Sequence, residues 1–406
     1  MKNLKNVISL ALCITMILFI FTSCSTSAEK DNEKNSVENI NNNNNVIDEN
    51  NEQVEAKDFS WSIDETGTLT VSGNGAMPDW ELYQTPWEDK KQEISAIKIE
   101  EGITTVGAYA FASAKNVASI SLPNSLIRIN EFAFSNCNSL KSLDLPTNLE
   151  IIGMEAFAIC SNITSLNIPQ SVKVIGDSAF ACWFSLENLT LNEGLIKIET
   201  DAFNSCIKLE YAFIPASVQE ITGGIFSGCH ALSNVEISAD NKNYVIEDNV
   251  IYSSDKSVLV NCLHNKTGEF QVPDTVKQIL PGAFHGCNDL TAIILPQGLV
   301  SIERECFRHC ASIEKIEIPY GVEKIGEAAF DNCNSATEII IPETVTEIAD
   351  EAFSSCDILL TLKIPASVTS IGENILGYVV STTLLVKEGS AAHQYALSNG
   401  LAYELY

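Results

Sequence analysis

The chain is poor in positive charge. It carries 24 Lys and Arg against 53 Asp and Glu, so its formal net charge is −29 over 406 residues. A protein that binds nucleic acid or anionic lipid electrostatically needs clustered basic side chains to neutralise phosphates. The composition therefore argues against a nucleic-acid partner and against polybasic attachment to a membrane.

Patterns for metal binding and catalysis are also missing. None of the 13 cysteines belongs to a CxxC pair, and the five histidines show no recurring pairing with a serine or a cysteine. Carboxylates are abundant, but no pair has a placement that indicates general acid–base catalysis. We expect no catalytic residue, no metal site and no cofactor; an enzyme or metalloprotein that uses the thiols is kept as a rival interpretation.

Apart from one N-terminal segment, long apolar runs are absent. Lys2 and Lys5 precede an apolar run from Val7 to about Phe21, too short for a comfortable membrane span, and the sequence Phe21-Thr22-Ser23-Cys24 follows. This arrangement resembles the signal peptide of a bacterial lipoprotein. It predicts a signal peptide over residues 1–23 and lipidation of Cys24; an ordinary secretory signal cut nearby is the alternative.

The segment over residues 24–58 has almost nothing apolar. Between Ser25 and Asp58 it contains ten Asn, nine acidic residues and three Lys. Such a composition cannot bury enough surface to offset chain entropy, so we expect a disordered tether. A random coil of this length spans roughly 30–35 Å, which would keep the folded part near its lipid anchor.

What the rest of the chain does have is an internal repeat. Phenylalanines recur every 23 residues, at Phe111, Phe134, Phe157, Phe180, Phe203 and Phe226, and again at Phe284, Phe307, Phe330 and Phe353, with Leu376 in the next position. A fixed short period indicates a solenoid. The unit reads approximately LxxLxLPxxVxxIGxxAFxxC. Its LxLP part alternates apolar and polar residues and predicts a strand, the Val-x-x-Ile part predicts a second extended segment, and the AFxxC part has room for about one helical turn.

This unit, together with the preceding segment FSWSIDETGTLTVSGNGAMPDWELYQTPW, resembles the BspA-type leucine-rich repeat surface proteins. The resemblance extends over nearly all of residues 59–406. It implies a β-rich repeat solenoid of the right-handed leucine-rich-repeat kind, with a parallel sheet, exported to the bacterial cell surface. Some members of that family act as adhesins.

The two ends of the repeat region are expected to form caps, and its middle is expected to be interrupted. A hairpin with ETG as its turn predicts an N-terminal β cap over residues 59–93. A C-terminal cap of one helix and one strand is expected over residues 384–406. Its helix has the spacing of Ser390 to Asn399, with Ser390 as N-cap and Gly400 as the residue that ends it. The solenoid occupies residues 94–383. Phe226 and Phe284 are 58 residues apart, two units plus 12, so we expect an irregular insertion at about 238–272, with strands joined at Asp248-Asn249 and Ser254-Asp255.

The recurring cysteines form one column of the repeat, here called the thiol column: Cys137, Cys160, Cys206, Cys229, Cys287, Cys310, Cys333 and Cys356. Ala114, Trp183 and Val379 take the same position in other units, which favours a buried packing position over disulfides or metal. Cys306 belongs to an alanine column and is expected in the core. Cys182 and His309 fall in a variable column expected at the surface, so the run Cys306 to Cys310 should not converge on a metal.

The outward side chains of the LxLP strands are the candidate binding residues, because the residues flanking the second apolar position of each strand point away from the core. Most are polar, and Tyr211, Phe213, Ile294 and Ile340 are exceptions. Exposed apolar residues with polar neighbours are typical of interaction hot spots. The predicted partner-binding residues are Tyr211, Phe213, Asn234, Glu236, Ile294, Lys315, Glu317 and Ile340. The alternative for Tyr211 and Phe213 is that the insertion after Phe226 folds back and covers them.

Together these features predict a lipid-anchored protein on the extracellular face of the bacterial membrane. Its solenoid would bind a protein or glycan partner, in adhesion, and would touch the membrane only through the anchor. The rival from another class is a structural or scaffolding protein of the cell envelope.

Overall fold

The computed structural model describes residues 57–378 and 381–406. The predicted signal peptide, the lipidation site at Cys24, nearly all of the tether and Val379 lie outside these residues. Within them, none of the helices has the length and apolar character that crossing a membrane requires.

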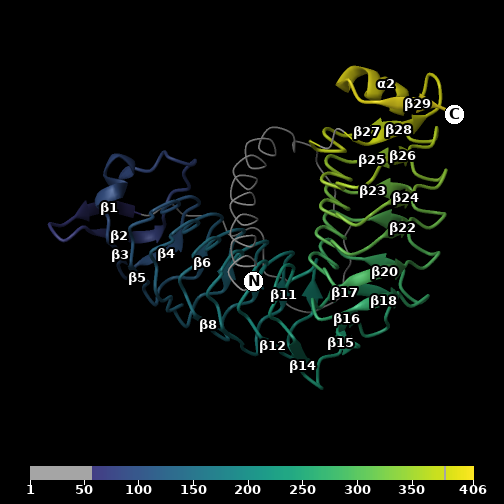
Figure 1. Cartoon of the computed structure of the whole chain (residues 1–406). Coiled ribbons are helices and arrows are strands. Elements are labelled where there is room, and N and C mark those ends of the chain that lie inside the picture. Colours follow the sequence, from purple (N-terminus) through teal and green to yellow (C-terminus); the bar gives the residue numbers. More distant parts are fainter. Residues whose placement is uncertain (1–56, 379–380) are drawn as a thin grey trace, which may run out of the picture. The chain divides into compact units, whose positions relative to one another are not determined.

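Each repeat is one coil with two short strands (Figure 1). The first strands, which match the LxLP segments, are β3 (Ala96–Ile99), β5 (Ser119–Ser121), β8 (Ser165–Ile168), β10 (Asn188–Leu191), β12 (Tyr211–Ile214), β14 (Asn234–Ile237), β18 (Gly268–Gln271), β20 (Leu290–Ile294), β22 (Lys315–Glu317), β24 (Glu338–Ile340), β26 (Thr361–Lys363) and β28 (Thr383–Val386). The second strands are β4 (Ile103–Val106), β6 (Arg128–Ile129), β7 (Ile151–Ile152), β9 (Val174–Ile175), β11 (Lys197–Ile198), β13 (Glu220–Ile221), β19 (Gln278–Ile279), β21 (Ser301–Ile302), β23 (Lys324–Ile325), β25 (Glu347–Ile348) and β27 (Ser370–Ile371). The leucine-rich-repeat solenoid with parallel sheets is thus confirmed.

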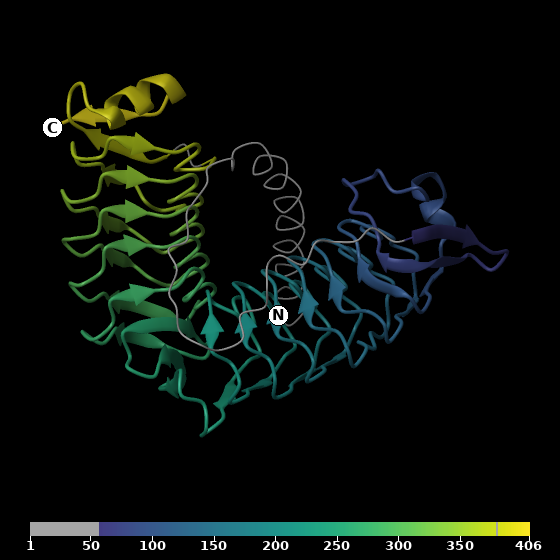
Figure 2. The same cartoon turned by 180° about the vertical axis from the view of Figure 1, so that it is seen from behind.

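The coils stack in register because each has the same length. Leu189 pairs with Leu166 in the first-strand ladder, and Ile175 pairs with Ile152 in the second, so partners are 23 residues apart in both. All of these ladders between coils are parallel. Figure 2 shows the first strands of the C-terminal coils from behind, one above another.

One coil departs from the pattern. Residues 141–145, which carry the expected LxLP segment of the second full unit, form no strand, although Leu143 is buried. The first-strand ladder is therefore interrupted between β5 and β8. Its pairing also breaks between β10 and β12, between β20 and β22, and between β24 and β26, so the first strands form several short parallel sheets.

The repeat phenylalanines fill the interior and stack on one another. Ring centroids of successive phenylalanines are 5.1 Å apart for Phe111 and Phe134, and 6.0 Å apart for Phe203 and Phe226. Trp87 of the N-terminal cap stacks on Phe111 at 5.3 Å and continues the column. Each unit thus adds one aromatic ring to a stack that runs from Phe111 to Phe226 and resumes from Phe284 to Phe353.

The AFxxC segments are turns whose backbone alternates in handedness. Residues two before and two after each phenylalanine commonly have a positive φ, such as 56° at Tyr109 and 60° at Ser113. The N–H groups of Tyr109, Phe111 and Ser113 all donate to carbonyl oxygens of the next coil. This geometry gives the turns their own hydrogen-bond ladder, parallel to the two strand ladders.

The insertion interrupts the solenoid as expected. Its strands β15 (Tyr244–Glu247), β16 (Val250–Ser253) and β17 (Val258–Cys262) pair antiparallel, joined by turns at Asp248-Asn249 and Ser254–Ser257. The buried apolar residues form one cluster from Leu69 to Leu280 and a second from Val250 to Ala396. The insertion is therefore where two hydrophobic cores meet.

At this junction a hydrogen bond to a side chain replaces one backbone hydrogen bond of the turn ladder. In other coils the phenylalanine N–H donates to a backbone carbonyl of the next coil, but the N–H of Phe226 donates to Oδ1 of the buried Asn261 at 2.9 Å. The amide oxygen takes the place of the missing carbonyl. It keeps a buried donor satisfied where the repeat is broken.

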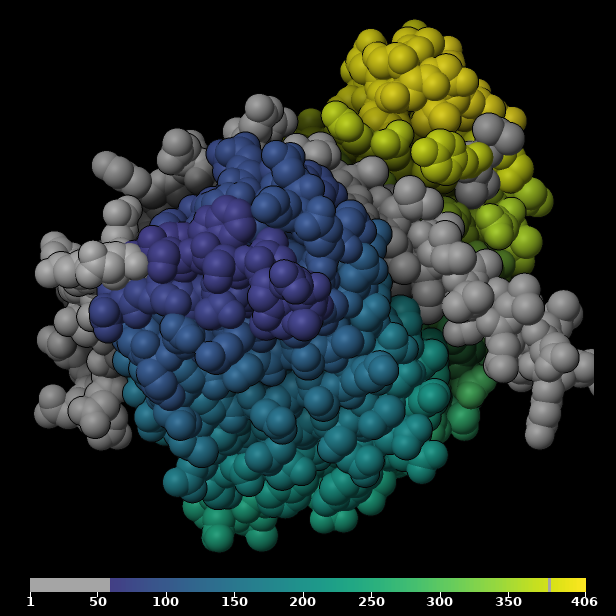
Figure 3. All heavy atoms as spheres, turned by 90° about the vertical axis from the view of Figure 1, so that its left-hand side faces the viewer, coloured from purple at the N-terminus to yellow at the C-terminus, as the bar shows by residue number. Residues whose placement is uncertain are grey.

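The N-terminal cap is a hairpin of β1 (Lys57–Ile63) and β2 (Thr68–Ala76), followed by the 3-10 helix η1 (Glu88–Glu93). The hairpin pairs Trp61 with Val71 and Ile63 with Leu69, which confirms the expected turn between them. Strand β2 then pairs with both β3 and β4, so it covers both sheets of the first coil. In Figure 3 the cap residues lie over the N-terminal end of the solenoid.

The C-terminal cap contains α2 (Ala391–Asn399) and β29 (Tyr403–Leu405), which pairs with β28. The side chain of Ser390 accepts a hydrogen bond from the N–H of His393, and Gly400 ends the helix with φ of 65°. Both predicted helix signals are confirmed.

Candidate partner-binding face

The first strands carry their side chains alternately into the core and into solvent. In β8, Leu166 and Ile168 are buried while Ser165 and Asn167 are exposed. The strand face is defined here as the outward side chains of the first strands. Its members lie in two columns, because the parallel register places each beside the equivalent residue of the next coil.

The predicted aromatic pair lies on this face in β12. The side chain of Tyr211 is 42% exposed and that of Phe213 is half-buried, while Ala212 between them is fully buried. The insertion therefore does not cover Tyr211, and the alternative in which both rings are core is wrong for this residue.

Four of the predicted residues lie together. Strand β12 pairs with β14, so Tyr211 lies beside Asn234 and Phe213 beside Glu236. Partial desolvation and the negative charge of the nearby Glu236 raise the pKa of Tyr211. The phenol therefore stays protonated and can donate a hydrogen bond to a partner.

The other four predicted residues lie beyond the insertion. Ile294 is 46% exposed on β20, Lys315 and Glu317 are exposed on β22, and Ile340 is 36% exposed on β24. Nζ of Lys315 lies 3.1 Å from Oε2 of Glu338 across the β22–β24 pair. The predicted set therefore forms two groups, one on β12 and β14 and one on β20 to β24.

The cysteines of the thiol column donate hydrogen bonds in addition to packing in the core. All eight of its cysteines are buried, and in most coils the sulfur lies close to the carbonyl oxygen of the phenylalanine 26 residues earlier, as in Cys137 to Phe111 at 3.4 Å and Cys310 to Phe284 at 3.1 Å. At Trp183 the indole Nε1 makes the same bond to Phe157. The position therefore holds a buried donor, a role that sequence reasoning missed although the Cys-to-Trp exchange hinted at it.

Burial also suppresses thiol reactivity. Desolvation raises the pKa of Cys137 to about 12 and raises that of Cys333 well above its usual value. Cys306 is fully buried, as predicted.

The expected surface position of Cys182 is wrong, since only 3% of this residue is exposed. His309, in the same column, is half-buried. The reason is that the turn ladders of adjacent coils press side chains of this column together, as in the 3.1 Å hydrogen bond between Asn136 and Ser113. Neighbouring turns thus shield a position that a single repeat would leave open.

A cluster of charged groups spans the junction of the two cores on this turn side. Arg304 Nη2 lies 3.4 Å from Oδ2 of Asp201, which comes from the other side of the insertion, and Arg304 Nη1 lies 3.0 Å from Oε1 of Glu305. Burial tends to raise the pKa of Glu305, but Arg308, His285 and Arg304 together hold it well below its usual value. Burial and the charge of Glu305 raise the pKa of Asp201.

Four of the five histidines gather beside this cluster. The rings of His230 and His264 are 4.7 Å apart edge to face, and those of His285 and His309 are 5.5 Å apart and stacked. His264 Nδ1 donates to the carbonyl oxygen of Gly286 at 2.6 Å. These histidines occupy different positions of the repeat, and His264 has no repeat position, so neither the period nor a pairing with Ser or Cys predicts that they lie together.

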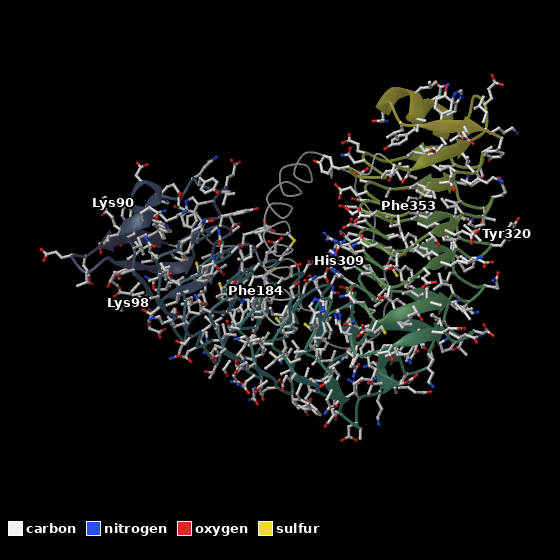
Figure 4. All side chains as sticks on the ribbon, in the orientation of Figure 1. Lys90, Lys98, Phe184, His309, Tyr320 and Phe353 are labelled. Carbon is white, nitrogen blue, oxygen red and sulfur yellow. The ribbon has the colours of Figure 1, made fainter. Side chains whose placement is uncertain are left out.

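Within residues 57–378 and 381–406, no group of three or more His, Cys, Asp and Glu side chains is placed to hold a metal ion. Figure 4 shows His309 and Tyr320 on opposite edges of the C-terminal coils, with Phe353 between them.

Several solved structures share this fold. A leucine-rich repeat protein from Eubacterium ventriosum is 23% identical with a TM-score of 0.50, and the match covers 77% of this chain and 91% of that one. A leucine rich cell surface protein from Faecalibacterium prausnitzii is 23% identical with a TM-score of 0.54, covering 83% and 95%. The pneumococcal vaccine antigen PcpA is 20% identical with a TM-score of 0.58, covering 86% and 96%. At these identities the likeness concerns the fold alone.

No match was found among curated proteins. The model of the BspA type leucine rich repeat region, which contains six copies, matches residues 89–191, 151–266 and 261–382. These matches cover most of the chain and coincide with the stacked coils, and the protein belongs to the BspA type leucine-rich repeat family.

Proposed function

We propose that the protein is a cell-surface binding protein whose strand face holds a protein or glycan partner, with adhesion as its role. The observation that carries this proposal is the exposure of Tyr211, with Phe213 beside it, on a largely polar sheet face. Rigid aromatic side chains with polar neighbours supply much of the affinity in known interfaces.

The repeat architecture supports a binding role more than an enzymatic one. A solenoid presents a long, rigid surface, and each coil contributes two outward side chains to it. The similar protein from Faecalibacterium prausnitzii is described as a cell surface protein. By analogy this chain would be displayed on the outside of a bacterial cell.

The proposed function includes attachment of the protein to the membrane through a lipid on Cys24. Lys2, Lys5, the apolar run and the Thr22-Ser23-Cys24 ending together indicate a lipoprotein signal. Replacing Cys24 with Ser should release the protein or leave an uncleaved precursor, detected by fractionation and by the mass of the processed chain. An unchanged amount of processed, membrane-bound protein would exclude lipidation.

The binding test compares the wild-type chain with a double variant, Tyr211→Ser and Phe213→Ser, against purified matrix proteins and defined glycans. We expect binding to be lost while circular dichroism and the melting temperature are preserved. Undiminished binding would place the site elsewhere, and a collapsed fold would show that the rings are core.

A scaffolding role inside the envelope is the competing function. Protease added to intact cells separates the two, because a displayed solenoid is digested and one enclosed by the wall is protected. Protection would favour the scaffold.

A further inference from the structure

The strand face changes its chemistry along the chain. In β8, β10 and β12 the outward residues are Ser165, Asn167, Asn188, Thr190, Tyr211 and Phe213, none of them charged. The coil before β8 has the exposed Asp144 at the equivalent position, so the uncharged stretch begins at β8. In β22, β24 and β26 four of the six, Lys315, Glu317, Glu338 and Lys363, carry a charge. An uncharged stretch is unexpected in a chain with 53 acidic residues.

Two of the three outward amides on β10, β14 and β8 are unengaged; in the third, Oδ1 of Asn167 accepts a hydrogen bond from Nδ2 of Asn192 at 2.9 Å. Elsewhere in the coils, asparagine side chains bind carbonyl oxygens of the preceding coil, as Asn116 does to Gln92 and Asn148 does to Asn124, both at 2.9 Å. In contrast, no hydrogen bond within the described parts of the chain involves the side chain of Asn188 or Asn234. Both are exposed.

Thr190 and Ser165 extend the same pattern. Their hydroxyl groups are exposed, and the described residues provide neither with a hydrogen-bond partner. The stretch therefore offers a two-dimensional array of donors and acceptors, with coils roughly 4.7–4.9 Å apart.

Tyr211 lies at one end of this array. Its ring is exposed, and its strand β12 pairs with β14, which places Asn234 beside it. Beside it, the carboxylate of Glu236 and the amide of Asn234 can accept and donate hydrogen bonds. An aromatic surface next to amides and one carboxylate suits a ligand that has C–H faces and many hydroxyl groups.

From this arrangement we propose that the strand face from β8 to β14 binds an uncharged glycan, with one sugar ring stacked on Tyr211 and further rings hydrogen-bonded along Asn234, Asn188 and Thr190. This deepens the proposed function and rests on it. An anionic polysaccharide would meet no basic side chain here and would face a chain of strongly negative net charge. A protein partner would be expected to match charges, and this stretch provides a single charged outward residue, Glu236.

The test is affinity electrophoresis of the full chain, in a detergent without a sugar headgroup, through gels that contain one defined polysaccharide. The neutral probes are a β-glucan, a mannan and a soluble chitin oligosaccharide; heparin and polygalacturonate are the anionic probes. We expect retardation by at least one neutral probe, lost when that probe is oxidised with periodate, and none by the anionic probes.

Tyr211→Ala should weaken retardation by about tenfold or more, the effect of losing one aromatic stacking contact. Asn188→Ala should weaken it less and serves if Tyr211→Ala lowers the melting temperature. The matched control is Tyr320→Ala, which removes a tyrosine that is 71% exposed and lies outside the strand face; its retardation should equal that of the wild type.

Failure of all neutral probes, or equal retardation of wild type and both strand-face variants, overturns the glycan proposal. If matrix proteins bind in a manner that needs Tyr211 and Phe213 while the glycans do not bind, the proposed function stands and the glycan assignment falls. If nothing depends on these rings, both fall.

Discussion

The indole Nε1 of Trp183 donates a hydrogen bond of 2.7 Å to the carbonyl oxygen of Phe157, and it does so from a position that cysteine holds in neighbouring coils. Cys160 makes the corresponding bond to Phe134 with its thiol, at 3.4 Å. A large aromatic and a small thiol thus replace one another because both are buried donors. Similarity of size does not explain the exchange.

Removing this donor should destabilise the solenoid. Among the described residues Trp183 is the only donor to the Phe157 carbonyl, and leaving a buried acceptor unpaired costs about 1–3 kcal/mol. We expect that loss when Trp183 is replaced by benzothienylalanine, which keeps the bicyclic shape without the N–H. Urea unfolding measures it, and a change below about 0.5 kcal/mol would show that packing alone accounts for the position.

The fold could be predicted from the sequence because every coil repeats the same pattern of apolar positions. Phe157 and Phe330 could be assigned to the core from their spacing, and Asn399 and Gly400 could be assigned to a helix end from local signals. Contacts between coils were harder to predict. Burial of Cys182 depends on the turn of the next coil, which the pattern within one repeat does not show.

The same limit applies to the junction and the binding face. The contact between Asp201 and Arg304 joins residues 103 apart across an irregular insertion, so no fixed period predicts it. The outward direction of Tyr211 followed from alternation along the strand. Its exposure required knowing where the insertion lies.

Thiol labelling should be slow throughout the native protein. All eleven cysteines in the described ranges are buried, and burial raises the pKa of Cys356 to about 12, so little reactive thiolate is available. We expect a thiol reagent to label the column cysteines only after denaturation, as judged by mass spectrometry. Cys182 should behave like them; rapid labelling of this residue in native protein would contradict its buried position.

Loss of one phenylalanine ring should disrupt the nearer core first. Phe157 belongs to the N-terminal apolar cluster and Phe330 to the C-terminal one, and either Phe→Ala change should cost about 3–5 kcal/mol. In a stack of coils the damage spreads mainly to neighbours. Hydrogen exchange should therefore rise most in residues 94–237 for Phe157→Ala and in residues 290–376 for Phe330→Ala. Equal loss of protection along the whole chain in both variants would show a single cooperative unit.

Acid should weaken the junction through its histidines. Burial, assisted by the nearby His285, Arg308 and His230 and opposed by Glu305, lowers the pKa of His309 to about 2 from 6.5. Between these values the unfolded chain binds a proton at His309 that the folded chain does not, so the free energy of unfolding falls as the pH drops below about 6.5. At about pH 5 this one group would account for at most about 2 kcal/mol.

His309→Asn should remove that part of the acid sensitivity. Asparagine suits the position, because Asn136 and Asn332 occupy the same turn position with φ of 62° and 59°. Urea unfolding at about pH 7 and about pH 5 should show a smaller loss for the variant than for the wild type, by up to about 2 kcal/mol. Ser355→Asn, the same new residue in the equivalent position of a later coil, is the matched control and should lose as much stability as the wild type. If His309→Asn also loses as much as the wild type, His309 takes up its proton as readily in the folded chain as in the unfolded one, and the junction does not exclude that charge.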